Sequence, residues 1–161
     1  MHKYISYALL YSLFAASFIA ASPHAFAGRG TKLVVIVAKE SPVTDLSKAE
    51  LKRAYLSDKL IVAGQKLVPF NFNAGTPERS AFDREVLGMS PEVMQRFWVD
   101  RKIRGQADAP RSLPSSAVMI KVVTRFPGAL AYIPVQDLTL DVKPVRIDGI
   151  EHTSPAYSIF K

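Results

Sequence analysis

The sequence predicts an α/β fold in which a largely parallel sheet is covered by helices. Lys32–Ala38 is a continuous apolar run rich in β-branched residues, and Ala129–Ile133 is a second apolar run. Such runs are typical of strands that are buried on both faces. Several helix starts, each with a capping Ser or Thr, lie between them. Because strands and helices alternate along the chain, a parallel sheet covered by helices is favoured.

The first predicted helix follows the first strand closely. Ser47 and Glu50 have the spacing of a capping box, in which each side chain bonds the backbone N–H of the other residue. We therefore expect a helix from there to about Leu56. Its inward-facing side chains are expected at positions 46, 51, 54 and 55.

The remaining elements continue the alternation. Leu67–Phe72 predicts an extended strand in which Pro69 lies where no hydrogen-bond donor is needed. Residues 105–114 are polar and interrupted by proline, which predicts an irregular loop. The other predicted elements are helices at about 77–87, 91–103 and 116–126 and extended segments at 129–133 and 142–147.

The first 27 residues have the pattern of a cleaved secretory signal. Met1–Lys3 carry a positive charge, Tyr4–Ala21 are apolar or small, and an Ala-x-Ala triplet ends at Ala27. A membrane anchor is the alternative, since spanning a bilayer takes roughly 20 apolar residues. Pro23 and the small residues near Ala27 favour cleavage. We therefore expect residues 28–161 to form a single domain in the periplasm.

The composition argues against several kinds of catalysis. The chain has no cysteine, which excludes thiol chemistry and cysteine metal sites. Of three histidines, only His152 lies outside the leader, which disfavours a catalytic triad or a histidine zinc site. No two acidic residues are placed by the sequence in one cleft. We therefore expect a protein that is not an enzyme, with no catalytic residue, no metal and no cofactor.

The net charge of +7 favours anionic partners, such as phosphate-like anions, acidic lipids or an acidic protein face. The basic residues are spread along the chain and lack interleaved aromatic residues. This pattern, in an exported chain, argues against nucleic acid as a partner.

One strand–loop–helix junction is the best candidate for an anion site. The strand ending at Phe72 leads into Asn73, Gly75 and Thr76, and then into a helix whose first N–H groups lack intrahelical partners. Gly75 permits close approach of a ligand, Asn73 and Thr76 offer side-chain donors, and Arg79 offers a fork of donors. The alternative is that Thr76 serves only as a helix cap.

Two serines are further candidates for the same site. Ser41 follows the first strand, and we expect it at the same edge of the sheet as Thr76. Ser115 precedes another helix start, where a capping role is the favoured alternative.

Several segments together resemble a known family. They are VVIV, TDLSKAELKRAYL, KLVPFNFNAGTPERSAFDREVLG, SSAVMIKVVTRFPGALAYIPV and VKPVRIDG followed by SPAYSIF. In order and spacing, these segments resemble the phosphate-binding periplasmic proteins of ABC importers, especially their short single-lobe relatives. The resemblance extends over nearly all of Lys32–Phe160.

The resemblance implies one lobe of a type II periplasmic-binding fold. It also implies that Gly75 and Thr76 hold phosphate oxygens. Two positions depart from the family pattern: Ala74 stands where a serine is usual, and an upstream arginine is missing near Phe70. Arg79 is the candidate substitute for that arginine.

Three functions are compatible with these observations. The favoured one is a solute-binding protein for phosphate or a related oxyanion, linked to ABC-type uptake. Because a single lobe gives half a site, a homodimer or a transporter partner would supply the other wall. The second is an interaction module that docks on a membrane sensor, porin or transporter, with its contact among the basic residues Arg101, Lys102, Arg104 and Arg111. An exported enzyme ranks last.

Overall fold

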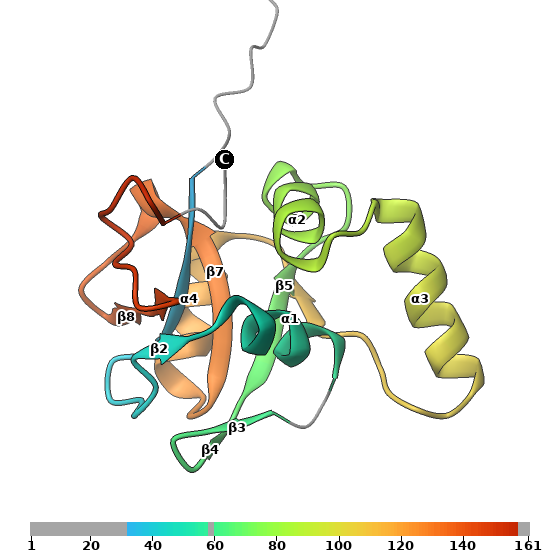
Figure 1. Cartoon of the computed structure of the whole chain (residues 1–161), viewed down its shortest axis with the longest axis horizontal. Helices are drawn as coiled ribbons and strands as arrows, with labels where there is room; N and C mark the ends of the chain where they lie inside the picture. Colours follow the sequence, from blue (N-terminus) through green and yellow to red (C-terminus); the bar gives the residue numbers. More distant parts are fainter. Residues whose placement is uncertain (1–31, 58–59, 158–161) are drawn as a thin grey trace, which may run out of the picture.

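The computed structural model describes residues 32–57 and 60–157 (Figure 1). The expected signal segment, residues 1–27, lies outside the described residues. So do Ser158–Lys161, the end of the apolar tail.

The centre of the molecule is a five-stranded sheet with the strand order β6-β5-β7-β1-β8. Its strands are β1 (Leu33–Ala38), β5 (Val68–Phe72), β6 (Arg111–Leu113), β7 (Ala129–Pro134) and β8 (Val142–Pro144). Strand β5 pairs in parallel with both β6 and β7, whereas β1 is antiparallel to both β7 and β8. Four strands therefore run in one direction and β1 runs in the other, which confirms the predicted largely parallel sheet.

Two small sheets flank the central one. Strands β2 (Asp45–Leu46) and β9 (Arg146–Ile147) pair in parallel. Strands β3 (Ile61–Val62) and β4 (Gln65–Lys66) form an antiparallel hairpin. The hairpin leads directly into β5, so it sets where that strand enters the sheet.

Helices lie on both sides of the sheet (Figure 1). They are α1 (Lys48–Leu56), α2 (Pro77–Phe82) with its π-helical continuation η1 (Asp83–Leu87), α3 (Pro91–Ile103), α4 (Ser116–Arg125) and the short 3-10 helix η2 (Val135–Asp137). Helix α4 packs on β7, β1 and β8, whereas α1 and α2 contact β5. In Figure 1, α3 extends away from the sheet at one side of the molecule.

Aromatic side chains fill the core between the sheet and α1, α2 and η1. The rings of Phe82 and Tyr132 are stacked, with centroids 3.9 Å apart and an interplanar angle of 3°. Tyr55 and Phe72 pack around this pair at centroid distances of 4.5 to 5.9 Å. All four residues are buried, which anchors the end of β5 and the start of α2 to the same core.

Two elements differ from the sequence-based predictions. Residues 105–114, predicted as an irregular loop, contain the edge strand β6. Its side chains are exposed or half-buried, so the apolar pattern used to predict strands is absent. The segment at 142–147, predicted as one extended element, contains β8 and β9, which belong to different sheets.

The capping box at Ser47 forms as predicted. The Glu50 amide donates to the Ser47 hydroxyl at 3.1 Å, and the Ser47 amide donates to the Glu50 carboxylate at 2.9 Å. The bond from the backbone N–H, followed by that from the hydroxyl, lowers the pKa of Glu50 below its ordinary value of 4.5. Ionised Glu50 therefore stabilises the folded state above that pH.

Replacing Glu50 with Gln tests this bond. We expect Glu50→Gln to be less stable than the parent at neutral pH by about 0.3–1 kcal/mol, because Gln can keep the capping-box bond but loses the charge that a helix start favours. The difference should shrink as the pH falls through the lowered pKa, because the parent then loses its carboxylate. Urea unfolding at neutral and acidic pH measures both, with the exposed Glu40→Gln as a control. A difference that did not change with pH would contradict this account.

Within residues 32–57 and 60–157, none of the helices is both long enough and apolar enough to cross a bilayer.

Candidate functional site

The candidate site lies at the edge of the sheet where the parallel strands β5, β6 and β7 end. The loop after β5 and the loop after β6 are neighbours, because the amide of Asn73 donates to the carbonyl of Leu113 at 3.2 Å. The helices α2 and α4 both begin at this edge. Polar groups from two helix starts therefore face the same region, as ligand sites in open α/β sheets require.

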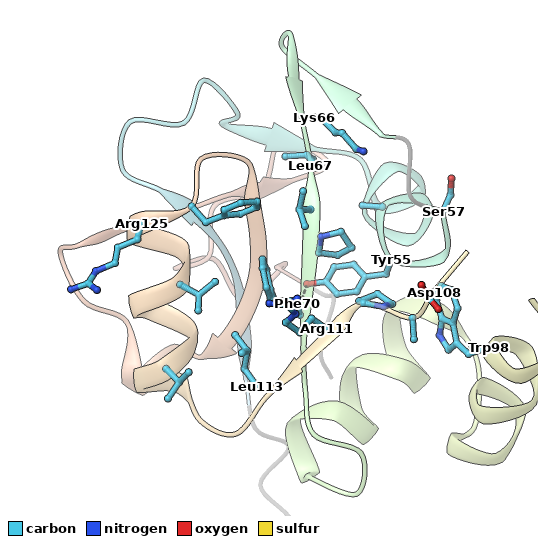
Figure 2. Close-up of a pocket in the computed structure, with 18 of the residues that line it drawn as sticks. Tyr55, Ser57, Lys66, Leu67, Phe70, Trp98, Asp108, Arg111, Leu113 and Arg125 are labelled. Atoms are coloured by element: carbon cyan, nitrogen blue, oxygen red, sulfur yellow. Dashed lines mark hydrogen bonds between the residues drawn. The ribbon is translucent and has the colours of Figure 1, made fainter. Parts of the chain in front are cut away.

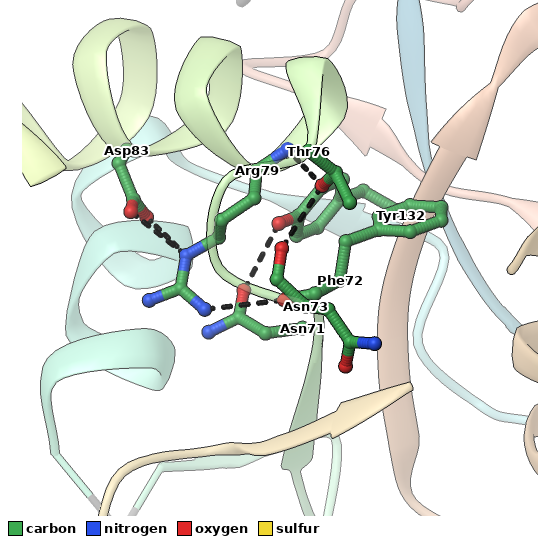
Figure 3. Close-up of polar contacts among 7 residues, drawn as sticks. All are labelled: Asn71, Phe72, Asn73, Thr76, Arg79, Asp83 and Tyr132. Atoms are coloured by element: carbon green, nitrogen blue, oxygen red, sulfur yellow. Dashed lines mark hydrogen bonds and ion pairs between the residues drawn. The ribbon is translucent and has the colours of Figure 1, made fainter. Parts of the chain in front are cut away.

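Thr76 caps helix α2, as the sequence predicts (Figure 3). Its hydroxyl oxygen accepts a hydrogen bond from the Arg79 amide at 3.2 Å, and its proton is donated to the Asn73 carbonyl at 3.0 Å. The Thr76 amide also donates to that carbonyl, at 3.3 Å. The Thr76 hydroxyl is thus engaged within the loop itself.

The Gly75 backbone is open to solvent. Gly75 has φ +87°, and a Cβ placed on it would meet nothing within 4 Å. Asn73 and Ala74 are also exposed. The amides of Ala74, Gly75 and Glu78 form no hydrogen bond with any of the described residues. The loop therefore combines exposed residues with N–H groups that have no partner among the described residues.

Arg79 is directed to its own helix and to β5 (Figure 3). Its Nε lies 2.8 and 2.7 Å from the two carboxylate oxygens of Asp83, and Nη1 donates to the Phe72 carbonyl at 3.3 Å. Within the described part of the chain, Nη2 is the nitrogen that forms no hydrogen bond. Arg79 therefore joins α2 to the end of β5, and the free fork of donors expected from the sequence is reduced to one nitrogen.

Asp83 is a buried carboxylate, and its environment has two opposing effects. Burial raises its pKa, whereas the charge of Arg79 and the hydrogen bond from Arg79 lower it. The effect of burial is the larger, so the pKa of Asp83 lies above its ordinary value of 3.8. Arg79 therefore acts first as the ion-pair partner of this buried carboxylate.

Ser115 lies at the predicted edge and caps α4. Its hydroxyl accepts a hydrogen bond from the Val118 amide at 3.4 Å. The hydroxyl of Ser116 donates to the carboxylate of Asp137 at 2.6 Å, which brings an acidic group to this edge. An anion here would be repelled by Asp137 and by Glu78, so its binding would depend on the backbone donors of the loop, on side-chain donors at the two helix starts and on the free nitrogen of Arg79.

Ser41 does not lie at this edge, and the prediction that it does was wrong. Because β1 runs antiparallel to β7, its end pairs with the start of that strand, Val37 opposite Leu130. Pro69, near the start of β5, also pairs with Leu130. Ser41 therefore lies at the opposite end of the sheet from Thr76, and its hydroxyl donates to Gln65 at 2.7 Å.

Asn71 is a polar residue beneath the loop that the sequence analysis did not single out. It is buried in β5, and its side-chain oxygen accepts a hydrogen bond from the Tyr132 hydroxyl at 3.0 Å (Figure 3). Burial raises the pKa of Tyr132 far above its usual range, so this hydroxyl stays a donor. An asparagine between two phenylalanines of an apolar strand was the available signal, since a buried amide needs a partner.

Comparison with solved structures shows which proteins share this fold. An ABC-type phosphate transport receptor from Vibrio cholerae matches with a TM-score of 0.59 at 18% sequence identity. A phosphate ABC transporter substrate-binding protein with bound phosphate from Clostridium perfringens matches with a TM-score of 0.58 at 23% identity. PstS from Borrelia burgdorferi matches with a TM-score of 0.50 at 11% identity. The predicted α/β fold class is confirmed, since these solved structures share the fold.

The match involves part of each partner. It covers 76% of this chain with the first two structures and 74% with the third, but only 47–48% of those chains. This chain therefore spans about half the length of the structures that it resembles. No family model matches the sequence, and no curated protein matches it either.

Proposed function

We propose that this chain binds phosphate or a related small oxyanion as a periplasmic solute-binding-like protein linked to ABC-type uptake. The observation that carries the proposal is the exposed loop Asn73–Thr76, which has unpaired amides and precedes helix α2 at the edge where parallel strands end. Main-chain N–H groups at such a position favour anions. The fold supports the same function, because phosphate transport receptors share it.

The proposed site comprises Asn73, Gly75 and Ser115, with the free nitrogen of Arg79 as a further donor. Thr76 holds the loop in place through its two bonds to the Asn73 carbonyl. Because this chain covers about half of its structural neighbours, the proposal includes a second wall supplied by another copy of the chain or by a transporter or sensor in the membrane. A half-enclosed site leaves part of the ligand in water, so the lone chain should bind weakly. Export through a cleaved segment 1–27, leaving residues 28–161 as a single domain, is part of the same proposal.

The decisive experiment compares two glycines with similar backbone geometry. Gly75 and Gly64 both have positive φ, +87° and +77°, and a Cβ on either meets nothing within 4 Å. Gly75→Val should weaken phosphate binding at least about tenfold. The branched side chain disfavours φ +87° and blocks the approach to the amide, and the loss of one hydrogen bond to a charged group costs about that much. Gly64→Val, in the β3–β4 turn, should leave it unchanged. Titration calorimetry with phosphate and sulfate measures both.

Glu78→Gln gives a second arm of this experiment. Removing a carboxylate from the first turn of α2 should strengthen phosphate binding, because like charges repel. If the parent protein and Glu78→Gln both release no heat with either anion, the oxyanion proposal is wrong.

The second candidate function is an interaction module that docks on a membrane sensor, porin or transporter. Helix α3 favours it, because Ile103 is 81% exposed and Val99 is 51% exposed beside the basic residues at its end. Crosslinking from Arg101, Lys102 or Arg104 to a membrane protein, with no anion binding, would favour this function over the first.

A further inference from the structure

A groove lined by none of the residues of the candidate anion site runs along the outer edge of β5 (Figure 2). Its volume is about 780 Å³, within the range of about 300–1,000 Å³ that is usual for small-molecule sites. Residues of α1, β5 and α4 form its walls, together with Trp98 of α3. Asn73, Gly75 and Thr76 do not line it.

The groove exists because strand β6 is too short to cover β5. Strand β6 pairs only with Phe70, Asn71 and Phe72. Val68 and Pro69 pair with β7 on the other side, so their outer side is left without a neighbouring strand. Pro69 has no N–H group to leave unpaired there, which lets this edge border a cavity instead of another strand.

The walls of the groove are mostly apolar. Val68, Pro69 and Phe70 contribute from β5, and Val122 and Phe126 contribute from the end of α4. The rings of Phe70 and Phe126 meet edge to face at a centroid distance of 6.1 Å, and Phe126 is still 45% exposed. An apolar ligand would cover this ring and remove apolar surface from water.

The charges around the groove are mainly positive. Four cationic residues and one acidic residue line it, namely Lys66, Arg111, Lys121, Arg125 and Asp108. Arg111 pairs with Phe70 in the β5–β6 register, so the backbone of Arg111 lies next to the apolar wall. None of the four cations forms an ion pair with a described residue. An apolar groove with unpaired cations is complementary to an anion with an apolar body.

We propose that this groove binds an anionic amphiphile, an alkyl chain that carries a carboxylate or phosphate head. The alkyl chain lies along Val68–Phe70 and Phe126, and the head group is held by Arg111 and Lys121. The proposal is independent of the anion loop, because the two sites share none of these residues.

The chain carries its own reporter for the test. Trp98 is the single tryptophan of the sequence and lines the groove. Dodecyl phosphate, added below its micelle concentration, should change Trp98 fluorescence in a saturable manner with one ligand bound per chain. Dodecanol and inorganic phosphate should each bind at least about tenfold more weakly, because each lacks one half of the interaction.

Variants assign the binding to the groove. Arg111→Gln with Lys121→Gln should weaken dodecyl phosphate binding at least about tenfold. The matched pair Lys102→Gln with Arg104→Gln, at the C-terminal end of α3 and outside the lining, should leave it unchanged. Gly75→Val should also leave it unchanged, which separates this proposal from the proposed phosphate site. The proposal is overturned if dodecanol binds as well as dodecyl phosphate, if the groove pair and the matched pair behave alike, or if no saturable signal appears.

Discussion

Gly128→Ala is expected to destabilise the protein by about 3 kcal/mol or more. Gly128 has φ +86°, and a Cβ there would lie 2.4 Å from the carbonyl oxygen of Lys66 and 3.6 Å from its carbonyl carbon. The left-handed backbone alone costs a non-glycine residue about 1–3 kcal/mol. The clash adds to that cost, because a main-chain carbonyl cannot rotate away as a side chain can.

The clash also affects a hydrogen bond at the start of strand β5. The carbonyl of Gly128 accepts a hydrogen bond from the Val68 amide at 2.8 Å, which joins the start of β5 to the turn before β7. Moving Lys66 away from a new methyl group would strain this bond. A loss of about 3 kcal/mol is a large part of the total for a typical domain, about 5–15 kcal/mol, so the urea midpoint should fall markedly.

Gly105→Ala is the matched control for this prediction. Gly105 also has positive φ, +64°, but a Cβ on it meets nothing within 4 Å. Its substitution therefore tests backbone strain without the clash and should cost about 1 kcal/mol. If the two variants lose the same stability, the approach of the Lys66 carbonyl has no energetic effect and the account is wrong.

The sequence predicted those parts of the fold that local signals determine. The capping box at Ser47 and Glu50 and the end of the 77–87 helical segment at Gly88 depend on residues a few positions apart, and both form. The contact of Gly128 with Lys66 could not be predicted in this way, because Lys66 lies 62 positions earlier in the chain.

The direction of β1 could not be predicted, and this affected the candidate site. A fully buried apolar strand has the same pattern in both directions, so Leu33–Ala38 gives no sign that it runs against its neighbours. Ser41 was consequently expected at the wrong edge. Strand β6 was missed because its three residues carry no buried apolar pattern and are held by pairing with β5.

The role of Arg79 could have been inferred more fully. Arg79 and Asp83 are four positions apart, the spacing at which side chains on a helix meet. The sequence analysis treated Arg79 only as a candidate ligand. The spacing does not reveal that both side chains are buried. Burial makes this ion pair differ from the usual solvent-exposed pair on a helix surface.

Arg79→Ala is expected to cost about 3 kcal/mol of stability, because it leaves Asp83 buried without its partner. The two side chains are only 11% and 3% exposed. The Phe72 carbonyl would also lose a donor. Arg104→Ala is the matched control: Arg104 pairs with Asp100 at the same spacing, but these side chains are 63% and 56% exposed. Its loss should change the stability by no more than about 0.5 kcal/mol.

The pH dependence distinguishes an unpaired charge from lost packing. The pKa of Asp83 is raised, so Asp83 favours folding at low pH, and this contribution is lost as the pH rises through the folded pKa. Without Arg79, which lowers the pKa of Asp83, that pKa should rise further. The cost of Arg79→Ala should therefore be largest at neutral pH and shrink as the pH falls through the raised pKa of Asp83, below which the carboxyl is neutral.

The double variant Arg79→Leu with Asp83→Leu completes the argument. If the destabilisation comes from an unpaired carboxylate, removing both charges should restore most of the stability that Arg79→Ala loses. Phosphate binding by this double variant then tests the remaining nitrogen of Arg79 as a ligand in a chain that still folds. A double variant no more stable than Arg79→Ala, with no dependence of either on pH, would mean that Arg79 acts through packing alone.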